Sequence, residues 1–173
     1  HAAQHSDHRE GEGDLVAQLK AAVNSIPSYL ARSTMMWILV PPVKHESLEG
    51  AICDFNSWRK RGWCRLEFAA SKLCAGDDMP CMVIASATAT PEYCAPCDIF
   101  KLCAGRGDFT VDSDKHNIVD ICVGLWATSL VQRHLKGGRT HLVRIHELIT
   151  ARLRECFPVA YFGDLIELLE KGL

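Results

Sequence analysis

The sequence predicts a small α/β domain with a short, mainly parallel sheet and crossover helices, followed by a helical C-terminal part. Two apolar runs, at 35–40 (MMWILV) and 79–87 (MPCMVIASA), have the length and bulk of strands that are buried on both faces. A stripe of apolar residues with helical spacing lies between them, at Trp63, Leu66, Ala70 and Leu73. Because parallel strands need such a connection, the order predicts an α/β unit.

The first residues of the chain predict a polar arm before the domain. Residues 1–13 are polar and contain Gly11 and Gly13, so we expect an irregular segment there. They include neither an initiating methionine nor a signal peptide, which suggests a fragment or a processed product. Residues 14–173 are expected to form a single domain, with a first helix that starts at Asp14 and ends near Pro27.

The remaining segments are predicted to be loops and helices. We expect surface loops at 43–57 and 91–107. The helical C-terminal part is predicted to begin with a long helix over 115–135 and to continue with helices at 140–156 and 164–169. The loops that follow the two strands would lie at the same carboxyl edge of the sheet, where open α/β folds bind ligands. Glu67 would approach that edge from a neighbouring helix.

Composition and charge exclude several classes of protein. A net charge of -2 gives no general attraction to nucleic acid. No run reaches the ~18 apolar residues that a membrane span needs, although peripheral association stays open. Nine cysteines, an odd number spread through apolar segments, predict reduced thiols in an intracellular compartment, either cytoplasm or the interior of an organelle. Cys94 and Cys97 form a lone CxxC pair without a second one, so we expect no metal site and no bound cofactor.

The segment 54–74 carries the densest group of candidate binding residues. Trp58 and Trp63 bracket a basic run, and tryptophan and arginine are the residues most enriched among binding hot spots. We therefore expect the contact surface for a protein partner to be formed by Trp58, Arg59, Arg61 and Trp63. The alternative is that Trp63 fills the core and the basic residues are only solvated.

Glu67 is the candidate catalytic residue. Helical spacing places it one turn beyond Trp63, and a carboxylate beside a large aromatic surface can be desolvated and have its pKa raised. General acids and bases need such a pKa. The alternative is a solvated glutamate that is paired with a nearby arginine.

The motif Trp63-Cys64-x-x-Glu67, between the two apolar runs, resembles the TIR domain family over about residues 15–93. The resemblance implies a flavodoxin-like or TIR-like sheet that is incomplete at the N-terminus, because the family's first strand has no counterpart here. It also implies NAD as a substrate, with Glu67 as the catalytic residue of the NAD-cleaving members. The sequences SIPSYL and ILVPP and the RGWCR motif are more similar to stretches of uncharacterised dinoflagellate proteins. That resemblance implies no established activity.

Two functions follow as hypotheses. The first is a non-catalytic protein-interaction module or accessory subunit of a larger assembly, such as one inside an organelle. The alternative is a TIR-like NAD+ nucleosidase that uses Glu67, with Trp63 or Trp37 stacked on a ring of the nucleotide. We favour the first, because a nucleotide site needs a phosphate-binding turn and no glycine-rich turn follows either predicted strand.

Overall fold

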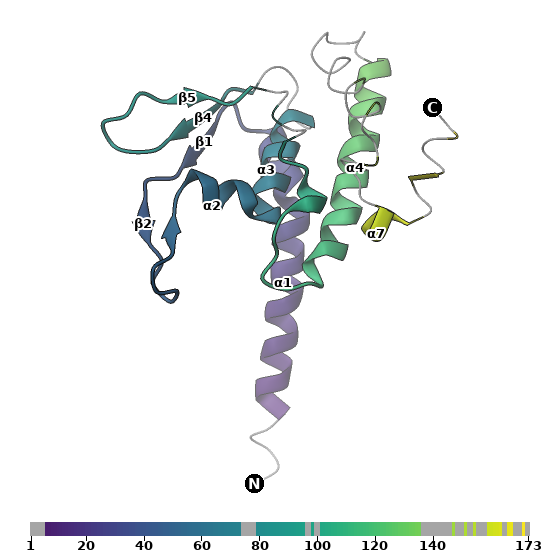
Figure 1. Ribbon diagram of the computed structural model, residues 1–173. Helices are drawn as coiled ribbons and strands as arrows, with labels where there is room; N and C mark the ends of the chain where they lie inside the picture. The colour runs from purple at the N-terminus through teal and green to yellow at the C-terminus, as the bar shows by residue number, and fades with distance from the viewer. Residues whose placement is uncertain are drawn as a thin grey trace.

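The computed structural model describes residues 6–73, 79–95, 98, 101–135, 147, 151, 154, 159–163, 166–167 and 171. Figure 1 shows a small sheet and a hairpin beside the packed helices α1 (Ser6–Ala31), α3 (Gly62–Leu73) and α4 (Asp114–Leu135), with α1 extending far beyond the others. The chain is therefore a mixed α/β structure, as the sequence predicts. None of its described helices is both long enough and apolar enough to cross a membrane.

The main sheet has the strand order β1-β4-β5. Strands β1 (Met36–Leu39) and β4 (Cys81–Ile84) pair in parallel, which confirms the predicted parallel pair. Strand β5 (Glu92–Tyr93) pairs with β4 in the antiparallel direction, so the sheet is mixed rather than mainly parallel. The prediction was wrong there because a short loop reverses the chain after β4, and only a longer crossover could have added another parallel strand.

The sheet is buried on one face. Ile38, Val40, Cys81 and Val83 belong to the core together with Leu66 and Phe68 of the helix α3. The opposite face, called here the outer sheet face, carries side chains of the alternate residues Trp37, Leu39, Met82, Ile84 and Tyr93. Trp37 is 54% exposed, Leu39 68% and Tyr93 56%. Burial on both faces was therefore a wrong prediction, since no described helix covers this second face.

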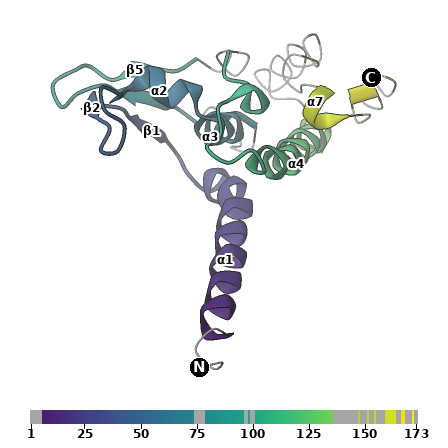
Figure 2. The same cartoon turned by 60° about the horizontal axis from the view of Figure 1, so that its bottom comes forward.

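Helix α1 (Ser6–Ala31) begins well before the predicted start at Asp14, within the segment that was expected to be an irregular arm. It also continues past Pro27, which lies inside the helix. Val23 and Leu30 pack against the core, and α1 contacts α3 along this second half. The first half projects away from the rest of the molecule (Figure 2). There Leu15, Val16 and Leu19 are each 66% exposed.

The segment expected to be one surface loop forms a hairpin of β2 (Val43–Lys44) and β3 (Ile52–Cys53). Gly50 has a φ of 76° in its turn, a conformation that favours glycine. Helix α2 (Phe55–Lys60) follows, and α3 (Gly62–Leu73) starts after a single extended residue, Arg61.

The predicted long helix is confirmed as α4 (Asp114–Leu135). Its buried residues include Ile118, Ile121, Cys122, Leu125 and Trp126, which recur at helical spacing and form one apolar face. The segment 91–107, expected to be irregular, contains β5 and the short helix η2 (Ala104–Arg106). The helices predicted at 140–156 and 164–169 lie outside the described residues, apart from isolated positions, and α7 (Val159–Phe162) lies between them.

Candidate functional site

A groove of about 860 Å³ lies where the carboxyl end of β1 meets the hairpin and α2. We call it the tryptophan groove, after Trp58 and Trp63. Besides these two it is lined by Leu39, Val40, Pro41, Val43, His45, Cys53, Asp54, Ser57, Lys60, Arg61, Asp108, Phe109, Thr110 and Asp114. The groove thus contains three of the four residues predicted to bind a partner, and Arg59 does not line it.

The break between α2 and α3 shapes one side of this groove. Asp108 lies against the break, where its backbone N–H donates to Lys60 O at 2.7 Å and its carbonyl oxygen accepts from Gly62 N at 2.9 Å. A Cβ on Gly62 would lie 1.8 Å from Phe109 Cζ, and one on Gly107 would lie 2.3 Å from Gly62 Cα. Because real Cβ atoms are never that close to other atoms, both positions need glycine. The segments 59–62 and 105–108, which are distant in sequence, are therefore two halves of one contact.

Helix α2 is capped at its N-terminus by the preceding residue, Asp54. The Asp54 side chain accepts from Ser57 N at 2.8 Å, and the Ser57 hydroxyl oxygen accepts from Asp54 N at 2.8 Å, which is a capping box. Trp58 stacks on Phe55 with the ring centroids 5.8 Å apart. The capped helix therefore holds Trp58 in a fixed position on the groove wall.

Trp63 is held from two sides. Its Nε1 donates to Asp114 Oδ2 at 3.1 Å, and its ring meets Phe109 edge to face with the centroids 6.3 Å apart. It is half-buried, so it both packs against the core and lines the groove. Packing of Trp63 in the core is therefore compatible with its predicted place on a binding surface.

The charged side chains of the groove differ in the hydrogen bonds and charged neighbours that they have. Asp54 and Asp114 accept the hydrogen bonds described above, and Asp108 lies near enough to Arg65 for its charge to act on the pKa of that guanidinium. Lys60 and Arg61 are exposed and form no ion pair with any residue that the structure describes. The groove therefore carries these two exposed cations beside three carboxylates, of which Asp108 is also exposed.

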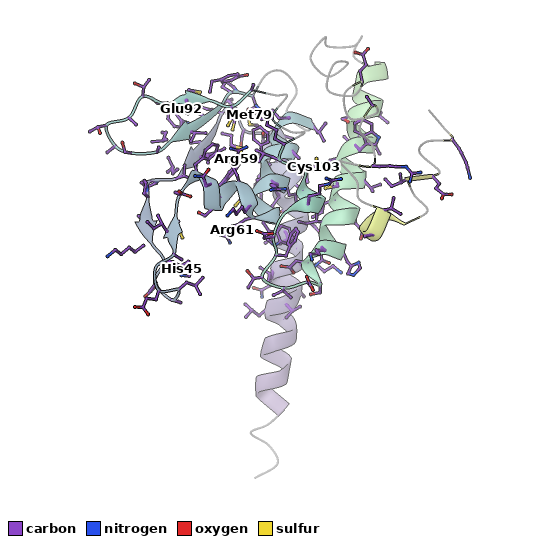
Figure 3. All side chains as sticks on the ribbon, in the orientation of Figure 1. His45, Arg59, Arg61, Met79, Glu92 and Cys103 are labelled. Atoms are coloured by element: carbon purple, nitrogen blue, oxygen red, sulfur yellow. The ribbon has the colours of Figure 1, made fainter. Side chains whose placement is uncertain are left out.

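Arg59 lies elsewhere. Its guanidinium sits over the Phe55 ring at 5.6 Å from the centroid. The pKa of Cys94 is lowered mainly by the side-chain hydrogen bond with Cys81, and the charge of Arg59 adds to this in the same direction. Figure 3 shows Arg59 and Arg61 on either side of α2. The four residues predicted to form one contact surface therefore do not lie together, because neighbouring residues at a helix end point in different directions. Arg59 lies apart from the other three.

Arg65 is a structural residue that the sequence analysis missed. Its Nε donates to Arg59 O at 2.6 Å and its Nη1 donates to Cys103 O at 3.2 Å. Burial lowers the pKa of this guanidinium. Arg65 thereby ties the end of α2 to the segment before η2, and only the helical spacing from Arg61 could have drawn attention to it.

Glu67 is half-buried on α3 and lines neither the tryptophan groove nor a second groove between α1 and α4. Burial raises its pKa, and the positive charge of Arg61 acts in the opposite direction. The second groove has a volume of about 580 Å³ and is lined mainly by small and polar residues, such as Asn24, Ser28 and Gly124. The structure thus places Glu67 close to Arg61 but away from both grooves.

Among the described cysteines, free thiols are found at Cys53, Cys64, Cys81, Cys94 and Cys122. Cys81 and Cys94 share a hydrogen bond between their side chains, which together with burial raises the pKa of Cys81. Cys97 lies outside the described residues, so the CxxC pair is not described as a unit. Among the positions with described side chains, no group of three His, Cys, Asp or Glu residues could hold a metal ion.

Comparisons of the chain with protein-family models, with curated proteins and with solved structures found no match. The resemblances to TIR domains and to dinoflagellate proteins therefore stay predictions from short motifs.

Proposed function

We propose that this chain is a non-catalytic protein-interaction module that works as an accessory subunit of a larger assembly. The proposal rests on the tryptophan groove, where Trp58 and Trp63 lie beside the exposed cations Lys60 and Arg61. Aromatic and arginine side chains in one concave site are typical of binding hot spots.

The chemistry of the groove favours an acidic segment with apolar side chains as the partner. Lys60 and Arg61 are exposed and form no ion pair with any residue that the structure describes, so they are available to carboxylates. Leu39 and Val43, which are 68% and 52% exposed, offer apolar contacts in the same groove. A segment that combines glutamate with leucine would satisfy both kinds of group.

Binding of a synthetic peptide of alternating glutamate and leucine tests this proposal through the fluorescence of the groove tryptophans. We expect Arg61→Glu to weaken binding about threefold to tenfold, because a favourable ion pair becomes a repulsion. Binding by the original protein should also weaken with added salt.

The matched control is Arg32→Glu, which makes the same charge change at an exposed position that lines neither groove. This variant should bind as the unaltered protein does. Equal binding by the Arg61→Glu protein, or no binding by the unaltered protein at concentrations where it is a monomer, would refute the proposal.

Incubation with NAD separates this proposal from the NAD+ nucleosidase alternative. Because Glu67 lines neither groove, we expect no nicotinamide release above that of Glu67→Ala. Release that Glu67→Ala abolishes would overturn the interaction-module proposal in favour of the enzyme.

A further inference from the structure

Two apolar surfaces of this chain have no cover among its described residues. The first is the outer sheet face. The strand register places Trp37 beside Met82 and Met82 beside Tyr93, so these three side chains form one row across the sheet. Leu39 and Ile84 form a second row next to it. Sheets that contain parallel strands are normally covered by helices on both faces, and here one cover is missing.

The second surface is the first half of α1. Val16 and Leu19 continue at helical spacing the stripe that Val23 and Leu30 place against the core, and Leu15 flanks them. Figures 1 and 2 show this half of α1 extending away from every other element. A helix that lacks packing is marginally stable in water, and Gly11 and Gly13 weaken this one further. The projecting half of α1 therefore needs a surface to pack against.

We propose that the chain forms a two-fold dimer in which α1 of each copy packs on the outer sheet face of the other. In each half of this dimer, Leu15, Val16 and Leu19 of one copy would cover the outer sheet face of the other copy. That sheet face would in turn give the projecting half of α1 a surface to pack against. The exchange is reciprocal, as a two-fold interface requires.

Charges of opposite sign border the two surfaces. The sequence of α1 before the stripe is acidic, with Asp7, Glu10, Glu12 and Asp14 against Arg9. Leu39 belongs both to the outer sheet face and to the tryptophan groove, whose exposed cations are Lys60 and Arg61. A helix that covers Leu39 therefore brings acidic turns towards those cations. In this respect the inference rests on the proposed function, because it names a second copy as the source of the acidic segment.

The available area also favours a reciprocal arrangement. Trp37, Leu39 and Tyr93, with Leu15, Val16 and Leu19, each expose between half and 70% of their surface, which leaves on the order of 100 Å² apiece. One copy thus offers roughly 600 Å² and a dimer roughly 1,200 Å², the lower bound for a stable interface. A single helix on a single sheet would bury only about half of that.

Sedimentation equilibrium of the full chain over a wide range of concentrations tests the proposal. We expect a dimer whose dissociation constant rises at least about tenfold in Leu19→Glu and in Trp37→Glu. Both residues are exposed in the single chain, so neither change removes a core contact. Tyr93→Glu serves as a second variant of the sheet face if Trp37→Glu does not fold. The matched control is Tyr29→Glu, which alters a residue of the same helix that is 69% exposed but lies on its docked half.

A mixture of the Leu19→Glu and Trp37→Glu proteins identifies the arrangement. The unaltered α1 of the second protein can pack on the unaltered sheet of the first, so we expect partial recovery of a mixed dimer. Helix-to-helix or sheet-to-sheet pairing would give no such recovery, and that result would overturn the proposal. A monomer at all concentrations, or loss of the dimer in Tyr29→Glu, would also overturn it.

The peptide titration, repeated on the Leu19→Glu protein, separates this inference from the proposed function. If the unaltered protein is a monomer and its peptide binding depends on Arg61, the interaction-module proposal stands and the dimer is refuted. The converse is a dimer that Leu19→Glu and Trp37→Glu dissociate, formed by a chain that binds no peptide. That result supports the exchange and refutes the groove as a site for other acidic partners.

Discussion

Single residues in the segment 54–74 have roles that differ from one position to the next. Trp58, Arg61 and Trp63 reach the same groove, whereas Arg59 packs over Phe55 and Glu67 lies away from the groove. Their grouping could be predicted because they are close in sequence. Asp114, which fixes Trp63, is 51 residues away, and no local pattern links the two. The grouping of these three side chains in one groove was therefore predictable, while the residues that position them were not.

The carboxyl group of Glu67 predicts a pH dependence of stability. Burial raises its folded-state pKa above the ordinary 4.5, so the folded protein holds this proton more tightly than the unfolded chain does. Stability from this group is therefore full below pH 4.5 and is lost as the pH rises through the raised pKa. Glu67→Gln should remove that loss and stabilise the protein at neutral pH, by under about 1 kcal/mol because the side chain is only half-buried.

Urea unfolding at neutral pH and at pH 4 measures this effect. The advantage of Glu67→Gln over the unaltered protein should be present at neutral pH and should shrink at pH 4. Glu46→Gln is the control, since Glu46 is an exposed residue of the hairpin turn. A Glu67→Gln protein that is less stable at neutral pH would show that the charged carboxylate has a favourable partner.

At the scale of elements, local patterns predicted the parts of the fold that bury long apolar runs. Strands β1 and β4 and helix α4 were predictable because their core residues recur at the strand or helix period. The hairpin and β5 were missed because each strand has only two residues and includes an exposed apolar side chain, Val43, Ile52 or Tyr93. The early start of α1 was missed because Gly11 and Gly13 weaken the local helical signal.

The junction between α2 and α3 depends on glycine at position 62. Gly62→Ala would force Phe109 to move, since the new Cβ would lie 1.8 Å from its Cζ atom. We expect a loss of about 1–3 kcal/mol in the free energy of unfolding, the usual cost of overpacking. Because Phe109 also packs on Trp63, the emission of the groove tryptophans should change as well.

Gly124→Ala is the matched control for this change. Gly124 lies inside α4, and a Cβ there would meet no atom within 4 Å. Alanine should therefore stabilise α4 by about 0.5–1 kcal/mol through helix propensity. Urea unfolding of the two variants should give effects of opposite sign, and a neutral Gly62→Ala would contradict the close contact with Phe109.

For the whole molecule, the sequence could not predict which apolar side chains of a strand or helix are buried and which stay exposed. Apolar runs indicate strands and helices, but they do not say whether a covering element belongs to the same chain. The run 35–40 reads as a strand buried on both faces, and Trp37 and Leu39 are nevertheless exposed. The same holds for Leu15 and Leu19, whose helical spacing predicts a buried stripe. Both departures are apolar surfaces that the proposed dimer would cover.

A dimer that packs in this way would link the stability of the fold to protein concentration. When the folded state is a dimer and the unfolded state a monomer, mass action raises the unfolding temperature as concentration increases. For a chain of this length we expect a rise of about 2 °C for each tenfold increase in concentration. Leu19→Glu should unfold at one temperature at all concentrations, whereas Tyr29→Glu should behave as the unaltered protein does. Thermal unfolding followed by circular dichroism, with reversibility checked on cooling, measures these temperatures. A concentration-independent midpoint for the unaltered protein would mean that its exposed apolar surfaces are not covered by a second copy in the folded state.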